Sequence, residues 1–432
     1  MPFETGAAAR RIAVIGGGIS GMGAAHMLAG SHRVVLFEAE PQLGGHARTV
    51  LAGKRGDQPV DTGFIVFNYA NYPHLARLFA ELDVPVAKSD MSFGASLRGG
   101  AVEYGLRDLR AVFAQKRNIA NPAYLRMLRD IFRFNARALE VARDPSMTVA
   151  EFLRALGTGD WFRDYYLLPL SGAIWSSPPQ GILEFPARAM VEFFDNHALL
   201  SHTGQHQWYT VQGGSGQYVA RLQHSLTSRG VDIRLGAATQ AVRRTAVGVE
   251  VKAEGAGWEP FDEVVFATHS DDSLRLLSDA TGVERAALAA VKYQPNEAVL
   301  HSDTSLMPKR RACWSSWVYT EAAEKASDRI DLTYWMNSLQ PIPKDDPLFV
   351  TLNSTRAIRD DLIHDPVTFR HPVYTAEALQ AQGLIRSING ANGTWFCGAW
   401  MKNGFHEDGL SSAVDVAQAM AARDGALAMA AE

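Results

Sequence analysis

One stretch near the N-terminus constrains the fold of this chain more than any other. Residues 12–15 are an apolar run of the kind that forms a buried strand, and Gly16, Gly18 and Gly21 follow it as a G-x-G-x-x-G turn. A helical pattern of small and apolar residues then continues to Leu28. The first glycine of such a turn permits a tight bend, the second lets the backbone approach a pyrophosphate, and the third lets helix and strand pack closely. The stretch therefore predicts a phosphate-binding turn between a strand and a helix, whose N-terminal N–H groups face the phosphates.

The residues that follow this helix indicate a dinucleotide as the ligand. A second apolar run, residues 34–37, ends on Glu38. An acidic residue at this distance from the glycine turn accepts hydrogen bonds from a ribose diol. An ordinary βα turn without a ligand is the alternative interpretation. The predicted dinucleotide contacts in this unit are Gly16, Gly18, Ile19, Ser20, Gly21, Glu38 and Ala39.

Composition excludes several other classes of protein. A chain of 432 residues with 47% hydrophobic content is long enough for more than one domain, and its net charge of −4 does not indicate nucleic-acid binding. Cys313 and Cys397 form no C-x-x-C pair, so we predict neither a disulfide framework nor a metal site. The chain has no G-x-S-x-G or H-E-x-x-H motif and no run of about eighteen apolar residues. We therefore expect a cytoplasmic protein.

Further motifs along the chain resemble one superfamily. These are the glycine pair Gly44-Gly45, the DTGF segment at 61–64, WYTVQGGSGQYV at 208–219, FCGAW at 396–400 and GFHEDGLSSA at 404–413. They resemble motifs of FAD-dependent amine oxidases, phytoene-type desaturases and protoporphyrinogen oxidases. Across nearly the whole chain the sequence is most similar to bacterial amine-oxidase-like proteins that are often encoded beside cyclopropane-fatty-acid-synthase-like methyltransferases.

The resemblance implies an α/β fold with two domains. A Rossmann-like FAD-binding domain of the amine oxidase type would comprise residues 1–72, 210–270 and 388–432. An inserted α+β substrate domain, containing an antiparallel sheet, would comprise residues 73–209 and 271–387. Strand patterns at 60–68, 90–97, 101–104, 298–301, 313–319, 331–336 and 348–352 fit this division.

The resemblance also implies where FAD is bound. The last helix, expected to begin near Asp408, would direct its N–H groups at the flavin N1/O2 edge. Ala399 stands where an acidic residue is usual in the superfamily, and His269 stands where proline is usual. The FAD contacts carried over from the superfamily are Gly44, Gly45, His46, Ala47, Gly63, Phe64, the backbone of Thr239, Gly398, Gly409, Leu410 and Ser411.

The same resemblance implies redox chemistry on unsaturated or methyl-branched acyl chains. Desaturation next to an existing double bond, as in furan fatty acid formation, is the nearest match. The flavin N5 would accept a hydride from an allylic carbon, and a base would remove a proton further along the chain. His46, His406 and Glu407 are the candidate bases, with Asp61 behind them. Glu407 or Asp408 fits equally well as a cap of the last helix.

The aromatic stretch from residue 161 to residue 200 fits either a core or an apolar tunnel for a long acyl lipid. Trp175, Phe193, Phe194 and Trp208 are the predicted substrate contacts. Two alternatives to acyl oxidation stay open. One is an amine or porphyrinogen-type oxidase that acts on a compact polar substrate. The other is a flavin-bearing lipid carrier, without catalysis, that serves the methyltransferase.

A basic region lies at residues 107–143. Asn121 and Pro122 predict the N-cap and first residue of a helix that ends near Arg143. Its arginines recur at three- and four-residue steps, as Arg126, Arg129, Arg133 and Arg137, while Leu125, Leu128, Phe132 and Leu139 indicate an apolar side. One interpretation is peripheral contact with anionic lipids on the inner face of the membrane. The other is a solvated helix face with pairs to Asp130 and Glu140.

Overall fold

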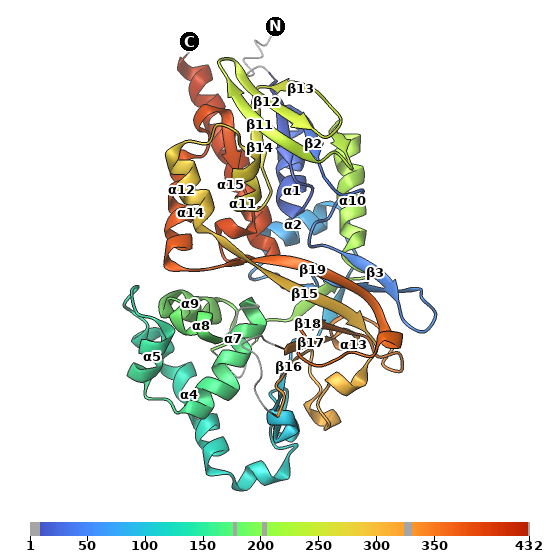
Figure 1. Cartoon of the computed structure of the whole chain (residues 1–432), viewed down its shortest axis with the longest axis vertical. Coiled ribbons are helices and arrows are strands. Elements are labelled where there is room, and N and C mark those ends of the chain that lie inside the picture. Colours follow the sequence, from blue (N-terminus) through green and yellow to red (C-terminus); the bar gives the residue numbers. More distant parts are fainter. Residues whose placement is uncertain (1–8, 176–178, 201–204, 324–330, 431–432) are drawn as a thin grey trace.

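The glycine-rich N-terminal stretch folds as predicted in the computed structural model, which describes residues 9–175, 179–200, 205–323 and 331–430. It forms β1 (Arg11–Ile15), α1 (Ile19–Leu28) and β2 (Arg33–Phe37). These strands belong to a parallel sheet in the order β10-β2-β1-β14-β20, completed by β10 (Asp232–Arg234), β14 (Glu263–Phe266) and β20 (Thr394–Phe396). Three distant parts of the chain therefore build one sheet, which forms the upper lobe in Figure 1.

Both faces of this sheet are covered, which explains why its strands are nearly all apolar. Ile12 and Val14 of β1 face one core, whereas Ala13 and Ile15 face the other. The first core also contains α1, α2 (Pro73–Glu81), α10 (Gly216–Ser228) and α15 (His406–Ala430). The second contains α11 (Ser270–Leu276), α12 (Gly282–Ala290), α14 (Ala376–Ile388) and the antiparallel strands β11 (Thr239–Thr245), β12 (Gly248–Ala253) and β13 (Trp258–Phe261).

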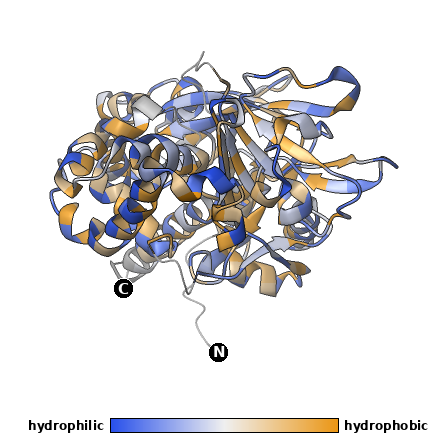
Figure 2. Ribbon diagram, turned by 90° about the horizontal axis from the view of Figure 1, so that it is seen from below, coloured by the Kyte–Doolittle hydropathy of each residue, from blue (hydrophilic) through white to orange (hydrophobic). Residues whose placement is uncertain are grey.

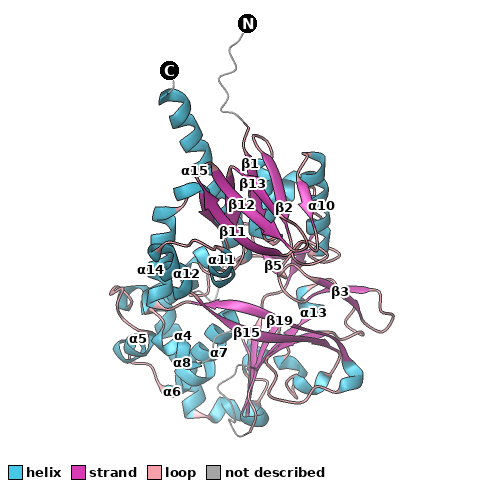
Figure 3. Ribbon diagram, turned by 45° about the horizontal axis from the view of Figure 1, so that its top comes forward, coloured by secondary structure: helices cyan, strands magenta, loops and turns pink. Residues whose placement is uncertain are grey.

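The lower lobe is built on a seven-stranded sheet, which contains the predicted antiparallel strands. Its order is β19-β15-β18-β17-β16-β7-β8, and only the β16–β7 pair is parallel. The strands are β7 (Phe93–Leu97), β8 (Val102–Gly105), β15 (Lys292–His301), β16 (Trp317–Thr320), β17 (Asp331–Trp335), β18 (Phe349–Leu352) and β19 (Ile363–Val373). The long strands β15 and β19 cross the middle of the molecule, between the lobes (Figures 1 and 3).

Helices pack against this second sheet in one hydrophobic core. They are α3 (Leu109–Val112), α4 (Pro122–Val141), α5 (Val149–Leu156), α6 (Asp160–Phe162), α7 (Leu168–Trp175), α8 (Pro179–Glu184) and α9 (Ala187–Asn196), with α13 (Met336–Leu339) after β17. Asn121 caps α4 as predicted, because its Oδ1 accepts the N–H groups of Ala123 at 3.0 Å and Tyr124 at 3.3 Å. Seen from below, the helices carry both hydrophobic and hydrophilic residues (Figure 2). Within the described ranges, none of the helices has the length and apolarity that crossing a membrane requires.

The packing draws the boundary between the lobes differently from the predicted residue ranges. Helices α2, α11, α12 and α14 were expected in the substrate domain, but their apolar residues join the two cores of the upper lobe. Conversely, Ala52 of β3 (Thr49–Ala52) and Val60 of β4 (Gln58–Asp61) pack into the core of the lower lobe. The boundary between the lobes is therefore set by hydrophobic packing. No glycine- or proline-rich linker in the sequence marks its position.

The predicted strand at 60–68 is wrong in one respect. It is divided into β4 and β5 (Val66–Phe67), and β5 pairs with β9 (Trp208–Val211) in a small sheet that also contains β6 (Val86–Ser89). The break falls at Gly63, where a Cβ atom would lie 2.0 Å from the carbonyl oxygen of His46. The chain therefore passes the backbone of His46 at a distance that only glycine permits.

Candidate cofactor site and active site

The phosphate turn has the close contacts that its glycines predict. Gly16 has a φ of +104°, and a Cβ at Gly21 would lie 1.8 Å from the Gly16 carbonyl oxygen. A Cβ at Gly18, in contrast, would meet no heavy atom within 4 Å, so the turn opens onto free space. The first helical bond of α1 runs from Met22 N to Gly18 O at 2.9 Å. The preceding N–H groups of the helix are thus available to a phosphate.

Glu38 lies at the ribose end of this turn. One carboxylate oxygen accepts the Gly17 N–H at 2.6 Å and the other accepts the Glu40 N–H at 2.9 Å. The Ala237 N–H donates to the Glu38 carbonyl at 2.8 Å, which brings the start of β11 alongside. Thr239, whose backbone is a predicted FAD contact, has a buried hydroxyl without a hydrogen-bond partner among the described residues. The remaining lone pairs of Glu38 are placed to accept ribose hydroxyls, and Thr239 lies on the adjacent segment.

The second glycine pair lies directly on the phosphate turn. Gly44 N donates to Gly17 O at 2.9 Å, and Gly44 and Gly45 have φ angles of +129° and +57°. A Cβ at Gly45 would lie 3.1 Å from the Gly18 Cα atom. Phe64 N donates to His46 O at 2.8 Å. The predicted contacts Gly44 to Ala47 and Gly63 to Phe64 are therefore brought together beside the phosphate turn.

The last helix also reaches this turn, but it begins at His406, two residues before the predicted start. Gly409 N donates to Phe405 O at 3.1 Å, so Gly409 already makes an intrahelical bond. The helix starts early because an Asp408 carboxylate oxygen accepts the N–H groups of Asn403 and Phe405 and closes the preceding loop. The free N–H groups at this helix start belong to His406, Glu407 and Asp408, which corrects the predicted role of Gly409.

The start of α15 packs against the start of α1. A Cβ at Gly409 would lie 2.8 Å from Ser20 Oγ, and a Cβ at Gly23 would lie 2.5 Å from a Leu410 methyl carbon. Gly398 N donates to Ser412 Oγ at 2.8 Å, and Ser411 Oγ accepts a hydrogen bond from Lys402 Nζ. Two helix N-termini and the Gly44-Gly45 turn thus meet at one place, from three separate parts of the sequence.

A cluster of histidines surrounds His46, next to this meeting point. The His46 ring lies 5.6 Å from that of His371, 5.9 Å from that of His269 and 4.9 Å from that of Phe369, measured between centroids. Burial lowers the pKa of His46 to about 4 and the pKa values of His269, His371 and His406 to about 3. All four rings are therefore neutral at pH 7, yet each stays partly accessible. Rings that are deep and still accessible are suited to contact a bound ligand.

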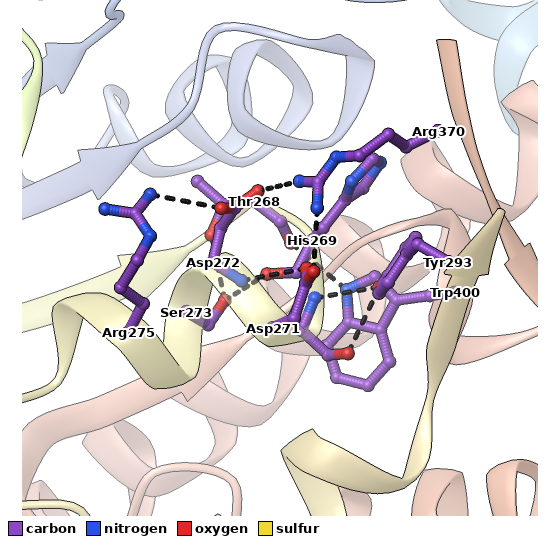
Figure 4. A network of polar contacts seen from close by, with 10 residues as sticks. Thr268, His269, Asp271, Asp272, Ser273, Arg275, Tyr293, Arg370 and Trp400 are labelled. Atoms are coloured by element: carbon purple, nitrogen blue, oxygen red, sulfur yellow. Dashed lines mark hydrogen bonds and ion pairs between the residues drawn. The ribbon is translucent and has the colours of Figure 1, made fainter. Parts of the chain in front are cut away.

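A polar network holds two of these histidines, His269 and His371, in place, and Figure 4 shows its part around His269. Arg370 of β19 donates to Asp271 at 2.7 Å and also to Asp272, at the start of α11. The His269 ring stacks on Tyr293 at 4.3 Å, and the Tyr293 hydroxyl accepts the Ser270 N–H at 2.8 Å. The network fastens β19 of the lower lobe to α11 of the upper lobe, which places His371 and His269 beside His46. His269, Asp271 and Asp272 are close enough to share a cation, but Arg370 already pairs with both carboxylates.

Of the four predicted bases, His46 and His406 remain suited to proton transfer. In the described part of the chain, the His46 ring nitrogens have no protein hydrogen-bond partner. The His406 ring stacks on Phe64 at 3.9 Å, and its Nε2 lies 2.5 Å from the Tyr218 hydroxyl. His406 is thus fixed in orientation, whereas both nitrogens of His46 are available to a ligand.

Glu407 and Asp61 have structural partners instead. The Glu407 carboxylate accepts the N–H groups of His74 and Leu75, both at 2.9 Å, and so caps α2 rather than the last helix. Asp61 is fully buried, and burial raises its pKa to about 6. It accepts hydrogen bonds from Thr49 Oγ1 at 2.6 Å, from the N–H and hydroxyl of Ser215 at 2.8 Å each, and from Gln340 Nε2 at 3.0 Å. We therefore assign neither carboxylate as a base.

Three of the four predicted substrate residues lie in one row of aromatic rings. Trp175 lies 5.0 Å from Phe193, and Phe193 stacks on Phe405 at 5.0 Å. His197 stacks on Phe193 at 3.9 Å and faces Trp208 at 6.4 Å. Phe405 directly precedes His406, so the row leads from α7 and α9 to the start of α15.

Phe194, the fourth predicted substrate residue, has a different position. Its side chain is fully buried and packs 5.7 Å from Phe134 of α4, so it belongs to the core of the lower lobe.

The sequence prediction also missed several residues of this site. They are Tyr218, His269, Phe369, His371 and Phe405. Phe369 and His371 occupy alternate positions of β19, a signal obscured by Pro366 and Pro372 in the same strand.

These features define a dinucleotide-binding protein whose phosphate turn lies beside a cluster of histidines contributed by both lobes. A family model described as flavin containing amine oxidoreductase matches residues 19–302. The chain belongs to this family, and it is an FAD-dependent oxidoreductase. The turn at Gly18, the two free helix starts and the Glu38 carboxylate fit FAD, because they supply space and N–H donors for its pyrophosphate and an acceptor for its ribose.

Solved structures show the same fold over almost the whole chain. A putative protoporphyrinogen oxidase from Exiguobacterium sp. 255-15 is 16% identical, with a TM-score of 0.69 and coverage of 96% of this chain and 99% of its own. A CLA-producing fatty acid isomerase from P. acnes is 13% identical, with a TM-score of 0.68 and coverage of 95% and 98%. Putrescine oxidase bound to putrescine is 15% identical, with a TM-score of 0.67 and coverage of 96% and 99%. Among curated protein sequences, none matches this chain.

Proposed function

We propose that this FAD-dependent oxidoreductase introduces a double bond into an unsaturated or methyl-branched fatty acyl chain. The observation that carries the proposal is the aromatic row of Trp175, Phe193 and Phe405, which ends at His406 and Phe64 of the cofactor site. Its rings are apolar and none of the three carries a charge, as contacts to an acyl chain require. A compact polar substrate would gain little from such a row.

A second observation argues against an amine held between two rings at the cofactor. Phe64 and His406 contact each other at 3.9 Å with an interplanar angle of 13°, so no substrate fits between them. The residue arrangement therefore favours an apolar chain that approaches along the row. The fatty acid isomerase among the structural neighbours is consistent with acyl chemistry on this fold, although at 13% identity it supports the fold alone.

In this proposed reaction the protein orients the acyl chain, excludes water and supplies a base. Bound FAD supplies the acceptor for a hydride from an allylic carbon of the acyl chain. The aromatic row aligns the chain, and the buried histidine cluster excludes water from the reacting carbons. His46 takes the proton released further along the chain, because its pKa of about 4 keeps it neutral and its ring nitrogens are unoccupied. His406, bound to Tyr218, orients the chain end that reaches the cofactor.

The experiment that tests this proposal is anaerobic mixing of the yellow, FAD-loaded protein with a methyl-branched unsaturated phospholipid while the flavin absorbance is recorded. We expect bleaching with this lipid and none with putrescine or a porphyrinogen. Phe193→Ala should slow bleaching at least tenfold, since it interrupts the row. Leu384→Ala, at an exposed position on α14, is the matched control. Bleaching by putrescine alone would instead establish an amine oxidase.

The role of His46 is tested in the same assay. His46→Asn removes the base but keeps a side chain of similar polarity, so FAD should stay bound. Loss of a general base lowers a rate by about 10²- to 10⁴-fold. Flavin reduction at the wild-type rate in a variant that stays yellow would remove His46 from this role and leave the substrate assignment intact.

A further inference from the structure

The large apolar side chains that are exposed to solvent gather on one part of the molecule. Eleven such residues occur in the described chain, and five of them lie in α3, in α4 and between these helices. The other six are distributed over both lobes, on separate elements. The five are Leu109 (77% exposed), Ile119 (58%), Leu125 (43%), Phe132 (58%) and Leu139 (51%). We refer to residues 107–143 as the α3–α4 surface. It lies in the lower lobe (Figure 1).

Helix α4 has two apolar sides. Tyr124, Met127 and Phe134 are fully buried and attach the helix to the core. Leu125, Phe132 and Leu139 are spaced by seven residues, so they form one row along the helix on the side turned away from that core. The apolar side that the sequence indicated is therefore largely this outer row. A soluble helix needs only one apolar side, which leaves the outer row unexplained by folding.

The arginines of α4 lie beside the outer row. At 100° per residue, Arg129 and Arg133 lie about 40° and 80° around the helix from Leu125, and Arg126 and Arg137 lie slightly further. The side chains of Arg126, Arg129 and Arg137 are 59%, 63% and 52% exposed. An exposed apolar row with a cationic row next to it is the pattern of a helix that lies in the interface of a lipid bilayer.

The charge of this surface contrasts with that of the rest of the protein. Residues 107–143 contain nine Lys and Arg and three Asp and Glu, a net charge of +6. Since the whole chain has a net charge of −4, the remainder carries −10. All three acids are engaged locally: Asp130 accepts the Gly159 N–H at 2.9 Å, Asp108 caps α3, and Glu140 pairs with Arg137 at 3.4 Å. A second copy of the chain on this surface would bring like charges together, whereas an anionic membrane offers the opposite charge.

We propose that the α3–α4 surface docks the protein on an anionic lipid bilayer. Leu125, Phe132 and Leu139 enter the boundary between headgroups and acyl chains, and the flanking arginines bind lipid phosphates. The row lies parallel to the bilayer, so α4 rests in the interface along its length. This inference rests on exposure and charge, and it is independent of the proposed reaction. Its connection with that reaction is that a membrane supplies acyl lipids.

The test uses the full-length FAD-loaded protein and vesicles of phosphatidylglycerol with phosphatidylcholine, against vesicles of phosphatidylcholine alone. We expect sedimentation with the anionic vesicles and at least tenfold weaker binding to the neutral ones. Binding should also weaken as salt is added, because the arginines act through screened charges. Failure of the wild-type protein to bind anionic vesicles overturns the proposal. Flavin reduction by lipid in detergent would still stand, so this failure is distinct from failure of the proposed function.

Two variants separate the charged and apolar parts of the surface. Arg110, Lys116 and Arg137 are exposed and pair with no buried acid among the described residues, so reversing them to Glu should leave the fold intact. Leu125→Ser with Leu139→Ser removes two residues of the outer row. Each variant should bind anionic vesicles at least tenfold more weakly than the wild type. The matched control is Leu235→Ser with Val247→Ser, at exposed positions of the upper lobe.

The remaining outcomes decide against the proposal. Wild-type binding by both surface variants, with thermal unfolding unchanged, would show that vesicles contact another surface. A dimer in solution that dissociates in the Leu125→Ser and Leu139→Ser variant would assign the outer row to a second copy. Binding of the control variant at one tenth of the wild-type level would show that any exposed apolar residue has the same effect.

Discussion

At the scale of single residues, glycine positions decide whether FAD fits. Gly21 is the clearest case, because a Cβ there would lie 1.8 Å from the Gly16 carbonyl oxygen, a contact between backbone atoms that cannot be relieved by a rotamer change. Gly18 has open space in front of it, where the pyrophosphate is expected. The glycine spacing was sufficient to predict this turn, because the tight bend and the close approach of helix and strand depend only on residues near one another in the sequence.

Gly21→Ala should therefore give a protein that retains little FAD. Its added methyl group must push α1 away from β1, which displaces the N–H groups that bind the phosphates. We expect at least about tenfold weaker FAD binding, equivalent to about 1.4 kcal/mol, measured by flavin fluorescence during titration. Gly30→Ala is the control, because a Cβ at Gly30 meets no atom within 4 Å. Equal FAD affinity in both variants would contradict the assigned turn.

The buried histidines make stability depend on pH. Burial lowers the pKa of His371 from 6.5 to about 3. Because the folded protein has the lower pKa, the unfolded chain takes up the proton first as the pH falls. The contribution of neutral His371 to the unfolding free energy is therefore complete above pH 6.5 and is lost as the pH falls toward 3. At about pH 5 the loss is about 2 kcal/mol for one such histidine. Burial raises the pKa values of Asp61 and Asp408 to about 6, which acts in the opposite direction.

Comparison of one variant with the wild type removes that opposing contribution. His371→Asn keeps a polar partner for Asn296, whose Nδ2 lies 2.9 Å from His371 Nδ1. Between about pH 7 and pH 5, its unfolding free energy in urea should fall by about 2 kcal/mol less than that of the wild type. His224→Asn, at an exposed position of α10, should follow the wild type. The same fall in all three proteins would mean that His371 is not protected from protonation.

At the scale of elements, helix starts and strand ends determine which groups face the cofactor. The sequence predicted α1, β2, β17, β18 and α4 closely, because each has a regular apolar pattern or a capping residue of its own. The start of α15 was placed two residues late, since Asp408 closes the loop at Asn403 and Phe405 through contacts that no sequence pattern announces. Strand β19 was missed altogether, because Pro366 and Pro372 hide an edge strand from any count of strand-forming residues.

Glu407 is a predicted base whose contacts show a structural role instead, as the cap of α2. Its carboxylate accepts two N–H groups at the start of α2, and the N-terminal end of that helix favours the negative charge. Glu407→Gln removes the charge and one acceptor, so the unfolding free energy should fall by about 1–2 kcal/mol in urea titrations. Glu140→Gln, which changes only an exposed pair with Arg137, should stay within about 0.5 kcal/mol of the wild type. An equally small effect of Glu407→Gln would contradict the capping role.

At the scale of the whole molecule, the residues of the candidate active site come together only because two lobes are fastened to each other. The Arg370 pairs bring β19 to α11, and the Asp61–Gln340 bonds join β4 to the residue after α13. These contacts link residues far apart in the sequence, so the sequence predicted the cofactor half of the site but only His46 and His406 of the histidine cluster. His269 and His371 acquire their place beside His46 only through the packing of the lobes.

The measurement that tests the central claim most directly is mass spectrometry of the lipid after a single anaerobic turnover. We expect about one equivalent of lipid lighter by two hydrogen atoms for each flavin that is bleached, with a new double bond beside the existing one. Lipid incubated with FAD-free protein should be unchanged. A product of unchanged mass with a moved double bond, or bleaching without any altered lipid, would contradict the account.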